Sequence, residues 1–280
     1  MGTTGKASSS GSRTTLATKQ TTTRIIAVAN QKGGVGKTDL VVNLSCQLAS
    51  LGKRTLIIDL DPQANATDYL VAPGTPAGRT AADMLLDDSV TLDDVVMEGC
   101  RENLDLIPSH QDLSSCQIRL ANDINMQFKL KKKLKAVADG SRGYDFVLID
   151  TPPSLGLLMV NTLTAASAVI IPVQTHYFAM DGVVHLQETI QRVREDINPG
   201  LKVLGVVLTM YDRRTLISRE VAEKVRDESS ERVFSTVIPV NVRLAEAPSH
   251  HKSIFEYDPE STGAKAYREL AKEILSCPDV

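Results

Sequence analysis

Asn30-Gln31-Lys32-Gly33-Gly34-Val35-Gly36-Lys37-Thr38 is the stretch that decides the fold of this 280-residue chain. An apolar run at 25–29 precedes it, and an apolar pattern with helical spacing follows it from Leu40 to Leu51. A strand, a glycine-rich turn and a helix in that order predict a phosphate-binding loop. The glycines allow backbone N–H groups to turn towards phosphates, and the new helix directs its positive end at them. The alternative is a glycine-rich turn that binds nothing.

Two lysines lie in this loop, at positions 32 and 37. Lys37 is placed to reach phosphate oxygens, and the hydroxyl of Thr38 is placed to coordinate Mg²⁺. The general pattern G-x-x-x-x-G-K-[ST] has glycine where this chain has Lys32. The residues expected to contact the nucleotide here are Lys32, Gly33, Gly34, Val35, Gly36, Lys37, Thr38 and Asp39.

Carboxylates end two further apolar runs. Asp59 and Asp61 follow the predicted strand 55–58, and Asp150 ends the run 146–149 in the manner of a Walker B strand. Ligands of open α/β sheets bind beyond the carboxyl ends of the strands. We therefore expect Asp59 and Asp150 to act on Mg²⁺ through water and Asp61 to orient an attacking water. A capped turn is the alternative for Asp59 and Asp61, because Asp-Pro and Asn are common turn formers.

Strands alternate with helices along the rest of the chain. Strands are expected at 104–108, 168–173 and 203–210, and helices at 80–86, 181–196, 216–228 and 262–275, with a long helical pattern over 111–139. This alternation predicts an α/β fold with a doubly wound, mostly parallel sheet flanked by helices. We expect one ATPase domain over 24–280.

Four motifs resemble the ParA/Soj family of deviant-Walker A partition ATPases, within the ParA/MinD superfamily. They are K-G-G-V-G-K-T at 32–38, D-x-D-P-Q-x-N-A-T at 59–67, D-T-P-P at 150–153 and R-L-A-E-A-P-S at 243–249. The resemblance covers about residues 24 to 276. It implies ATP and Mg²⁺ as cofactors and a slow, partner-stimulated ATPase. It also implies that Lys32 reaches the nucleotide of the partner protomer in an ATP-bound homodimer, and that Asp61 is needed for hydrolysis.

The resemblance further implies nonspecific binding to double-stranded DNA in the ATP state and a ParB-like activator. Such a protein drives chromosome or plasmid segregation and is cytoplasmic and nucleoid-associated. Pro239 and Asn241 are expected near the adenine base. The candidate DNA contacts are Arg213, Arg214, Arg219, Lys224 and Arg232, and ordinary solvated surface cations are the alternative for all five. The same two interpretations apply to the lysines at 129–135.

This chain departs from the family at two positions. Asp39 stands where the family usually has threonine, and Val240 stands where it usually has arginine. An acidic residue suits the first turn of a helix. Its charge near the phosphates is expected to weaken nucleotide affinity or to alter hydrolysis.

Composition limits the other possibilities. The formal net charge of −3 gives no global basic signature, so DNA binding would need a local basic patch. The four cysteines form no C-x-x-C pair, which disfavours a metal-cluster carrier of the nitrogenase-iron-protein type. No apolar run is long enough to span a membrane. A MinD-like ATPase that positions a protein assembly at a membrane or on the nucleoid is the alternative function, and Glu269 and Glu273 in the last helix disfavour lipid binding.

Residues 1–23 are rich in Ser, Thr and Gly and contain no acidic residue. This composition predicts a disordered tail. The tail is either simply solvated, a weak nonspecific nucleic-acid arm, or an organellar transit peptide; it lacks the apolar core of a secretory signal.

Overall fold

The computed structural model describes residues 2, 22–75, 78–121, 123–176 and 181–277. The predicted tail, apart from residues 2, 22 and 23, therefore lies outside the described residues. The strands are β1 Arg24–Val28, β2 Thr55–Asp59, β3 Met97–Arg101, β4 Leu104–Ile107, β5 Phe146–Asp150, β6 Ala168–Gln174, β7 Lys202–Tyr211 and β8 Val233–Pro239. The α-helices are α1 Lys37–Ser50, α2 Asn65–Leu70, α3 Ala81–Leu86, α4 Leu113–Leu120, α5 Lys129–Lys133, α6 Lys135–Ala138, α7 Leu157–Ala165, α8 Asp181–Asp196, α9 Leu216–Glu228, α10 Val242–Glu246, α11 Ile254–Tyr257 and α12 Thr262–Leu275. Two 3₁₀ helices, η1 Met126–Phe128 and η2 Ala247–His250, complete the described elements.

All eight described strands belong to one sheet in the order β3-β4-β2-β5-β1-β6-β7-β8. Only β3, at one edge, is antiparallel to its neighbour. The chain moves from β1 to one side of the sheet through β2 and to the other side through β6, so β1 lies at the point where the winding reverses. Ligand sites of doubly wound folds lie at this reversal. The predicted doubly wound, mostly parallel sheet is confirmed.

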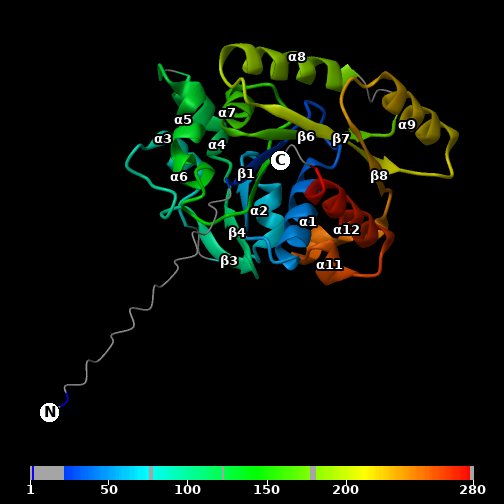
Figure 1. Ribbon diagram of the computed structural model, residues 1–280, viewed down its shortest axis with the longest axis horizontal. Helices are drawn as coiled ribbons and strands as arrows, with labels where there is room; N and C mark the ends of the chain where they lie inside the picture. Colours follow the sequence, from blue (N-terminus) through cyan, green and yellow to red (C-terminus); the bar gives the residue numbers. More distant parts are fainter. Residues whose placement is uncertain (1, 3–21, 76–77, 122, 177–180, 278–280) are drawn as a thin grey trace.

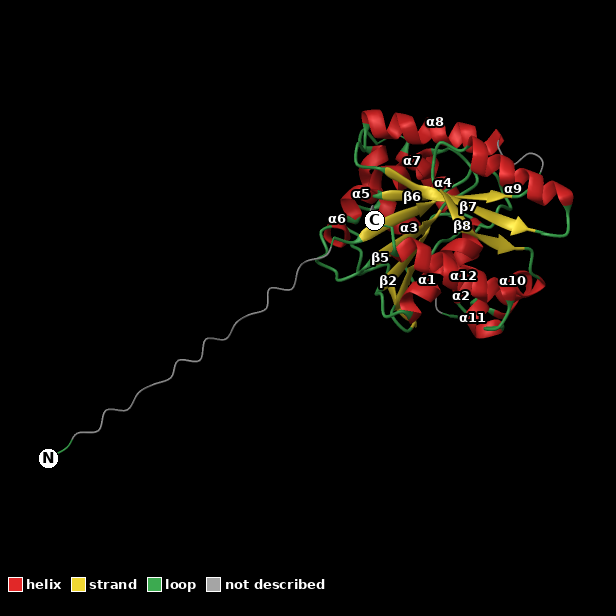
Figure 2. Ribbon diagram, turned by 45° about the vertical axis from the view of Figure 1, so that its right-hand side comes forward, coloured by secondary structure: helices red, strands yellow, loops and turns green. Residues whose placement is uncertain are grey.

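Helices cover both faces of the sheet. One hydrophobic core includes Ile25 and Ala27 of β1 and lies under α3 to α9, while the other includes Ile26 and Val28 and lies under α1, α2, α11 and α12. Figures 1 and 2 show α8 on one side of the sheet and α1, α11 and α12 on the other. Strands β2 and β5 are buried along their whole length, as expected for parallel strands covered on both faces.

The long helical pattern over 111–139 is wrong as a single helix. The structure divides it into α4, η1, α5 and α6. The carboxylate of Asp123 accepts a hydrogen bond from the Asn125 backbone N–H at 2.9 Å, and such local bonds compete with helix formation. Asn161 of α7 then fixes the new course, because its side chain accepts from Leu130 N–H and donates to the Met126 carbonyl.

Three lysines of the basic run have partners, and the weakest contact is that of Lys132, whose Nζ lies 3.7 Å from Asp88. Lys129 forms ion pairs with Asp88 and Asp123, and Lys133 donates to backbone carbonyls of the loop that follows α3. Lys131, Lys132 and Lys135 are exposed. Some lysines of this run therefore stabilise the loop after α3, and the others are exposed to solvent.

Candidate functional site

The loop between β1 and α1 has the backbone conformation that its glycines predict. Gly34 has φ 71° and Gly36 has φ 82°, and both values lie in the left-handed region that side chains disfavour. Gly36 is the N-cap of α1, and a phosphate there would meet the positive end of a 14-residue helix.

Hydrogen bonds to strands β6 and β7 hold this loop in place. Asn30 donates to the carbonyl of Pro172 in β6 at 2.7 Å and accepts from the Lys32 backbone N–H at 2.9 Å. Thr209 of β7 donates to the Val35 carbonyl at 2.9 Å. Thr209 was missed in the sequence, because only the sheet order brings β7 to this loop.

The two loop lysines differ in their surroundings. Lys37 is buried, and its Nζ donates to the Lys32 carbonyl at 3.1 Å. Burial lowers the pKa of Lys37, while the charges of Asp150 and Asp61 oppose this shift. Lys32 is only partly buried, and its ammonium has no hydrogen-bond or ion-pair partner among the described residues. Lys37 therefore contacts its own phosphate loop, whereas the Lys32 ammonium has no contact that holds it within its own protomer among the described residues.

Two buried carboxylates meet at the carboxyl ends of neighbouring strands, close to the phosphate loop. Asp59 and Asp150 are register partners at the carboxyl ends of β2 and β5, and both are fully buried. Thr38 donates to Oδ2 of Asp150 at 2.7 Å, while Oδ1 of Asp150 is buried with no hydrogen-bond partner in the described part of the chain. A hydroxyl beside an unpartnered buried carboxylate oxygen fits the oxygen ligands that Mg²⁺ prefers.

The charges of these carboxylates are costly in the isolated protein. Burial raises the pKa of Asp59 to about 6 against opposing hydrogen bonds from Thr67 and Asp61. Burial and the adjacent Asp59 raise the pKa of Asp150 well above its usual range. A cation bound here would offset both effects.

Asp61 begins a hydrogen-bonded loop that leads into α2. Its Oδ1 accepts from Gln63 N–H at 2.9 Å, and its carbonyl accepts from Ser109 Oγ at 2.7 Å. Thr67 joins the same network, because it donates to Asp59 and accepts from Ser109 N–H. Hydrogen bonds thus connect the carboxyl end of β2 to α2 and to Ser109 after β4.

Comparison with known proteins identifies the family. A family model described as an AAA domain matches residues 23–203. The chain is 46% identical over 253 residues to the sporulation initiation inhibitor protein Soj of Bacillus subtilis, which covers 90% of this chain and 98% of that protein. It is 44% identical over 254 residues to the chromosome partitioning protein ParA of Caulobacter vibrioides, with 90% and 94% covered. The chain belongs to the ParA/Soj family.

A solved structure of similar fold contains a bound nucleotide analogue and magnesium. Cobyrinic acid a,c-diamide synthase from Mycobacterium smegmatis, solved with a bound ATP analogue and magnesium, has a TM-score of 0.78 and 36% identity, with 90% of this chain and 94% of that one covered. The ParA/Soj assignment and this likeness agree with the resemblance carried by the four motifs.

Asp39, one of the two positions at which this ParA/Soj chain departs from its family, lies in a polar cluster. The carboxylate of Asp39 lies near the hydroxyl of Tyr69 in α2, and the backbone carbonyl of Asp39 accepts a hydrogen bond from the Asn43 amide at 2.9 Å. Asn43 of α1 donates to Tyr69 Oη at 3.2 Å and accepts from Ile254 N–H of α11 at 2.8 Å. Burial raises the pKa of Asp39 to about 6, although the nearby Tyr69 hydroxyl lowers it. Asp39 thus links the phosphate loop to α2 and, through Asn43, to α11.

Replacing Asp39 by asparagine is expected to stabilise the nucleotide-free protein above pH 6. The folded-state pKa of about 6 lies above the value of about 4 in an unfolded chain, so ionisation of Asp39 opposes folding. The gain should grow between pH 4 and 6 and then stay constant at about 1–2 kcal/mol, a value discounted for partial exposure. Urea unfolding of both proteins at pH 4.5 and pH 8 measures it. A gain independent of pH would show that the buried charge of Asp39 is not its cause.

The candidate DNA contacts do not lie together. Arg213, Arg214 and Arg219 lie after the carboxyl end of β7 and are exposed, whereas Arg232 precedes β8 and therefore lies at the amino ends of these two parallel strands. Arg232 contacts Phe234 and donates to Cys277 Sγ. Arg214 is bound through two hydrogen bonds of 2.9 Å to Asp212. Lys224 is 3.9 Å from Glu228.

The expected base-side residues lie at the carboxyl end of β8. Pro239 ends this strand beside Tyr211 of β7. Asn241 caps α10 by accepting from Arg243 N–H at 2.8 Å and donates to Thr262 Oγ1 at 2.7 Å. Its side chain therefore has a structural function in the isolated protein.

Proposed function

We propose that this protein is a partition ATPase that closes into a homodimer around ATP, binds double-stranded DNA nonspecifically in that state, and releases it after hydrolysis. The observation that carries this proposal is the pair of lysines in one phosphate loop, one directed into its own loop and one without a partner among the described residues. Chromosome or plasmid segregation with a ParB-like activator is the cellular role that the Soj and ParA relatives support.

Within one protomer, Lys37 and the loop amides would bind the β- and γ-phosphates. Thr38 would bind Mg²⁺ directly and Asp150 and Asp59 would bind it through water, and the ion would neutralise charge on the phosphates. Asp61 would orient the attacking water, since it is buried beside Lys37 at the end of β2. Pro239 and Asn241 would flank the base.

Lys32 would supply a positive charge to the nucleotide of the partner protomer. A cation donated across an interface acts like an arginine finger on charge that develops at the phosphates. ATP then joins two protomers, and loss of the γ-phosphate separates them. Hydrolysis would be slow until a ParB-like protein completes the site.

DNA binding would depend on the exposed cations beyond β7. A dimer doubles the number of neutralised phosphates, so the electrostatic part of its affinity rises steeply and falls with salt. Arg213 and Arg219 are the main candidates, because Arg214 and Lys224 have acidic partners within this protomer. Arg232 lies at the amino ends of β7 and β8, away from their carboxyl ends, and is left out of this surface.

A gel shift on nonspecific duplex DNA tests this part of the proposal. We expect binding with ATP and not with ADP, and weaker binding for Arg213→Ala. Loss of one phosphate contact per protomer should lower the slope of log K against log salt by about 2 for the dimer. Arg232→Ala is the matched control and should bind as wild type. Equal binding with ATP and ADP, or vesicle binding in place of DNA binding, would refute the DNA-partition function.

A further inference from the structure

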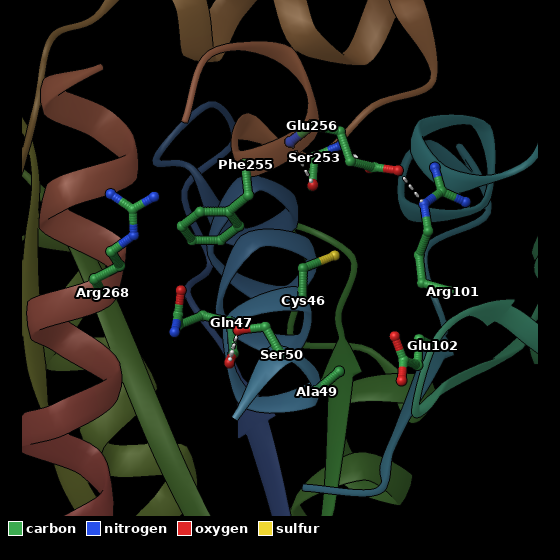
Figure 3. A pocket seen from close by; sticks show the side chains of 10 residues that line it. All are labelled: Cys46, Gln47, Ala49, Ser50, Arg101, Glu102, Ser253, Phe255, Glu256 and Arg268. Atoms are coloured by element: carbon green, nitrogen blue, oxygen red, sulfur yellow. Dashed lines mark hydrogen bonds and ion pairs between the residues drawn. The ribbon is translucent and has the colours of Figure 1, made fainter. Parts of the chain in front are cut away.

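A cavity of about 370 Å³ lies at the C-terminal end of α1, the end away from the phosphate loop. It is enclosed by α1, α11, α12 and the end of β3. Figure 3 shows its lining. This volume is within the range of small-molecule sites. Neither the phosphate loop nor the carboxylates beside it contribute to the lining, so the cavity is separate from the proposed ATP site.

Gln47 of α1 contributes a side-chain amide to the lining of the cavity. Its residue is only 8% exposed, and its side-chain amide has no hydrogen-bond partner among the described residues. An amide that has no protein partner in the described part of the chain and still reaches the cavity can form hydrogen bonds with a ligand in place of water. Figure 3 shows this amide directed towards the α12 side of the cavity.

Arg268 of α12 lies on the same side of the cavity as that amide. Its guanidinium carbon is 5.5 Å from the centroid of the Phe255 ring, and no carboxylate among the described residues pairs with it. A guanidinium held over an aromatic ring presents a planar fork of donors that matches a carboxylate.

The remaining walls favour an apolar body and disfavour high charge. Cys46, Ala49 and Phe255 line the middle of the cavity, and burial raises the pKa of the Cys46 thiol to about 12, so this wall is neutral. Glu102 lies on the opposite side from Arg268, and the Arg101–Glu256 pair at 2.6 Å has no net charge. The lining holds two arginines and two glutamates, so its formal net charge is zero, which favours a singly charged ligand over phosphates and other multiply charged anions.

We propose that this cavity binds a small monocarboxylate with an apolar or aromatic body. The carboxylate would be held by Arg268 and the Gln47 amide, and the apolar body would lie against Phe255, Cys46 and Ala49. Because α1 begins at the phosphate loop and ends at this cavity, the ligand would contact the same helix that positions Lys37 and Thr38.

Titration of the full-length protein with 3-phenylpropanoate and with 3-phenylpropanamide, followed by saturation-transfer NMR, tests the proposal. The two probes have the same shape and differ in charge. We expect the acid to bind about tenfold or more tightly than the amide, as for a charge-assisted hydrogen bond. Inorganic phosphate should not displace the acid.

Variants locate the binding. Arg268→Gln should abolish the preference for the acid, and Gln47→Leu should weaken acid binding about three- to tenfold. Lys272→Gln, an exposed cation on the same helix, is the matched control and should bind as wild type. Thermal melting verifies that each variant is folded. Equal binding of acid and amide, no binding of either, displacement by phosphate, or a preference that survives in Arg268→Gln would each overturn the proposal.

Discussion

Replacing Lys32 by alanine is expected to leave ATP binding nearly unchanged and to abolish ATP-driven dimerisation. The Lys32 ammonium has no partner among the described residues of its own protomer, so its removal breaks no contact seen there. Each charge-assisted hydrogen bond contributes about 1.5–3 kcal/mol, and a two-fold dimer loses two of them. The dimer should therefore dissociate about 10²- to 10⁴-fold more readily.

Sedimentation equilibrium with ATP measures the mass, and a fluorescent ATP analogue measures nucleotide affinity. Lys37→Ala is the control for the other lysine and should lose nucleotide affinity as well as dimerisation, because Lys37 is buried within its own loop. Loss of nucleotide binding in Lys32→Ala would place Lys32 in its own site and contradict the account.

Replacing Asp61 by alanine is expected to lower the rate of ATP hydrolysis about 10²- to 10⁴-fold, the range for a group that handles the proton of an attacking water. ATP binding and dimerisation should persist, because neither depends on the water. The variant should therefore accumulate as an ATP-bound dimer that stays on DNA.

Phosphate release from a saturating concentration of ATP measures this effect. Asp68→Ala, which removes an exposed carboxylate from α2, is the matched control and should hydrolyse ATP as wild type. A variant Asp61→Ala that hydrolyses ATP normally would remove Asp61 from the mechanism and leave its buried position as a structural feature of the loop.

Much of the fold follows from local signals in the sequence. The runs at 56–58 and 146–149 are apolar throughout because β2 and β5 are covered on both faces. The helix predicted at 216–228 matches α9, since its apolar residues repeat with helical spacing. Strand β3 was missed because Met97–Arg101 contains a glycine and a glutamate and lies at the sheet edge, where neither face needs an apolar pattern.

The site was predictable in its parts but not in its arrangement. The sequence places Asp59 and Asp150 each at the end of a strand, but only the sheet order makes them register partners. The partners of Asp39 come from α2 and, through Asn43, from α11, which lies more than 200 residues further along the chain. Long-range contacts of this kind leave no periodic signal in a single sequence.

The central claim is that Lys32 of one protomer acts on the nucleotide of the other, and mixing two inactive variants tests it most directly. Lys32→Ala retains Asp61, and Asp61→Ala retains Lys32, so a mixed dimer contains one nucleotide with its own Asp61 and the partner's Lys32. The account predicts that ATPase activity of the mixture rises well above the sum of the two separate activities. Activity equal to that sum, with mixed dimers shown to form, would contradict it.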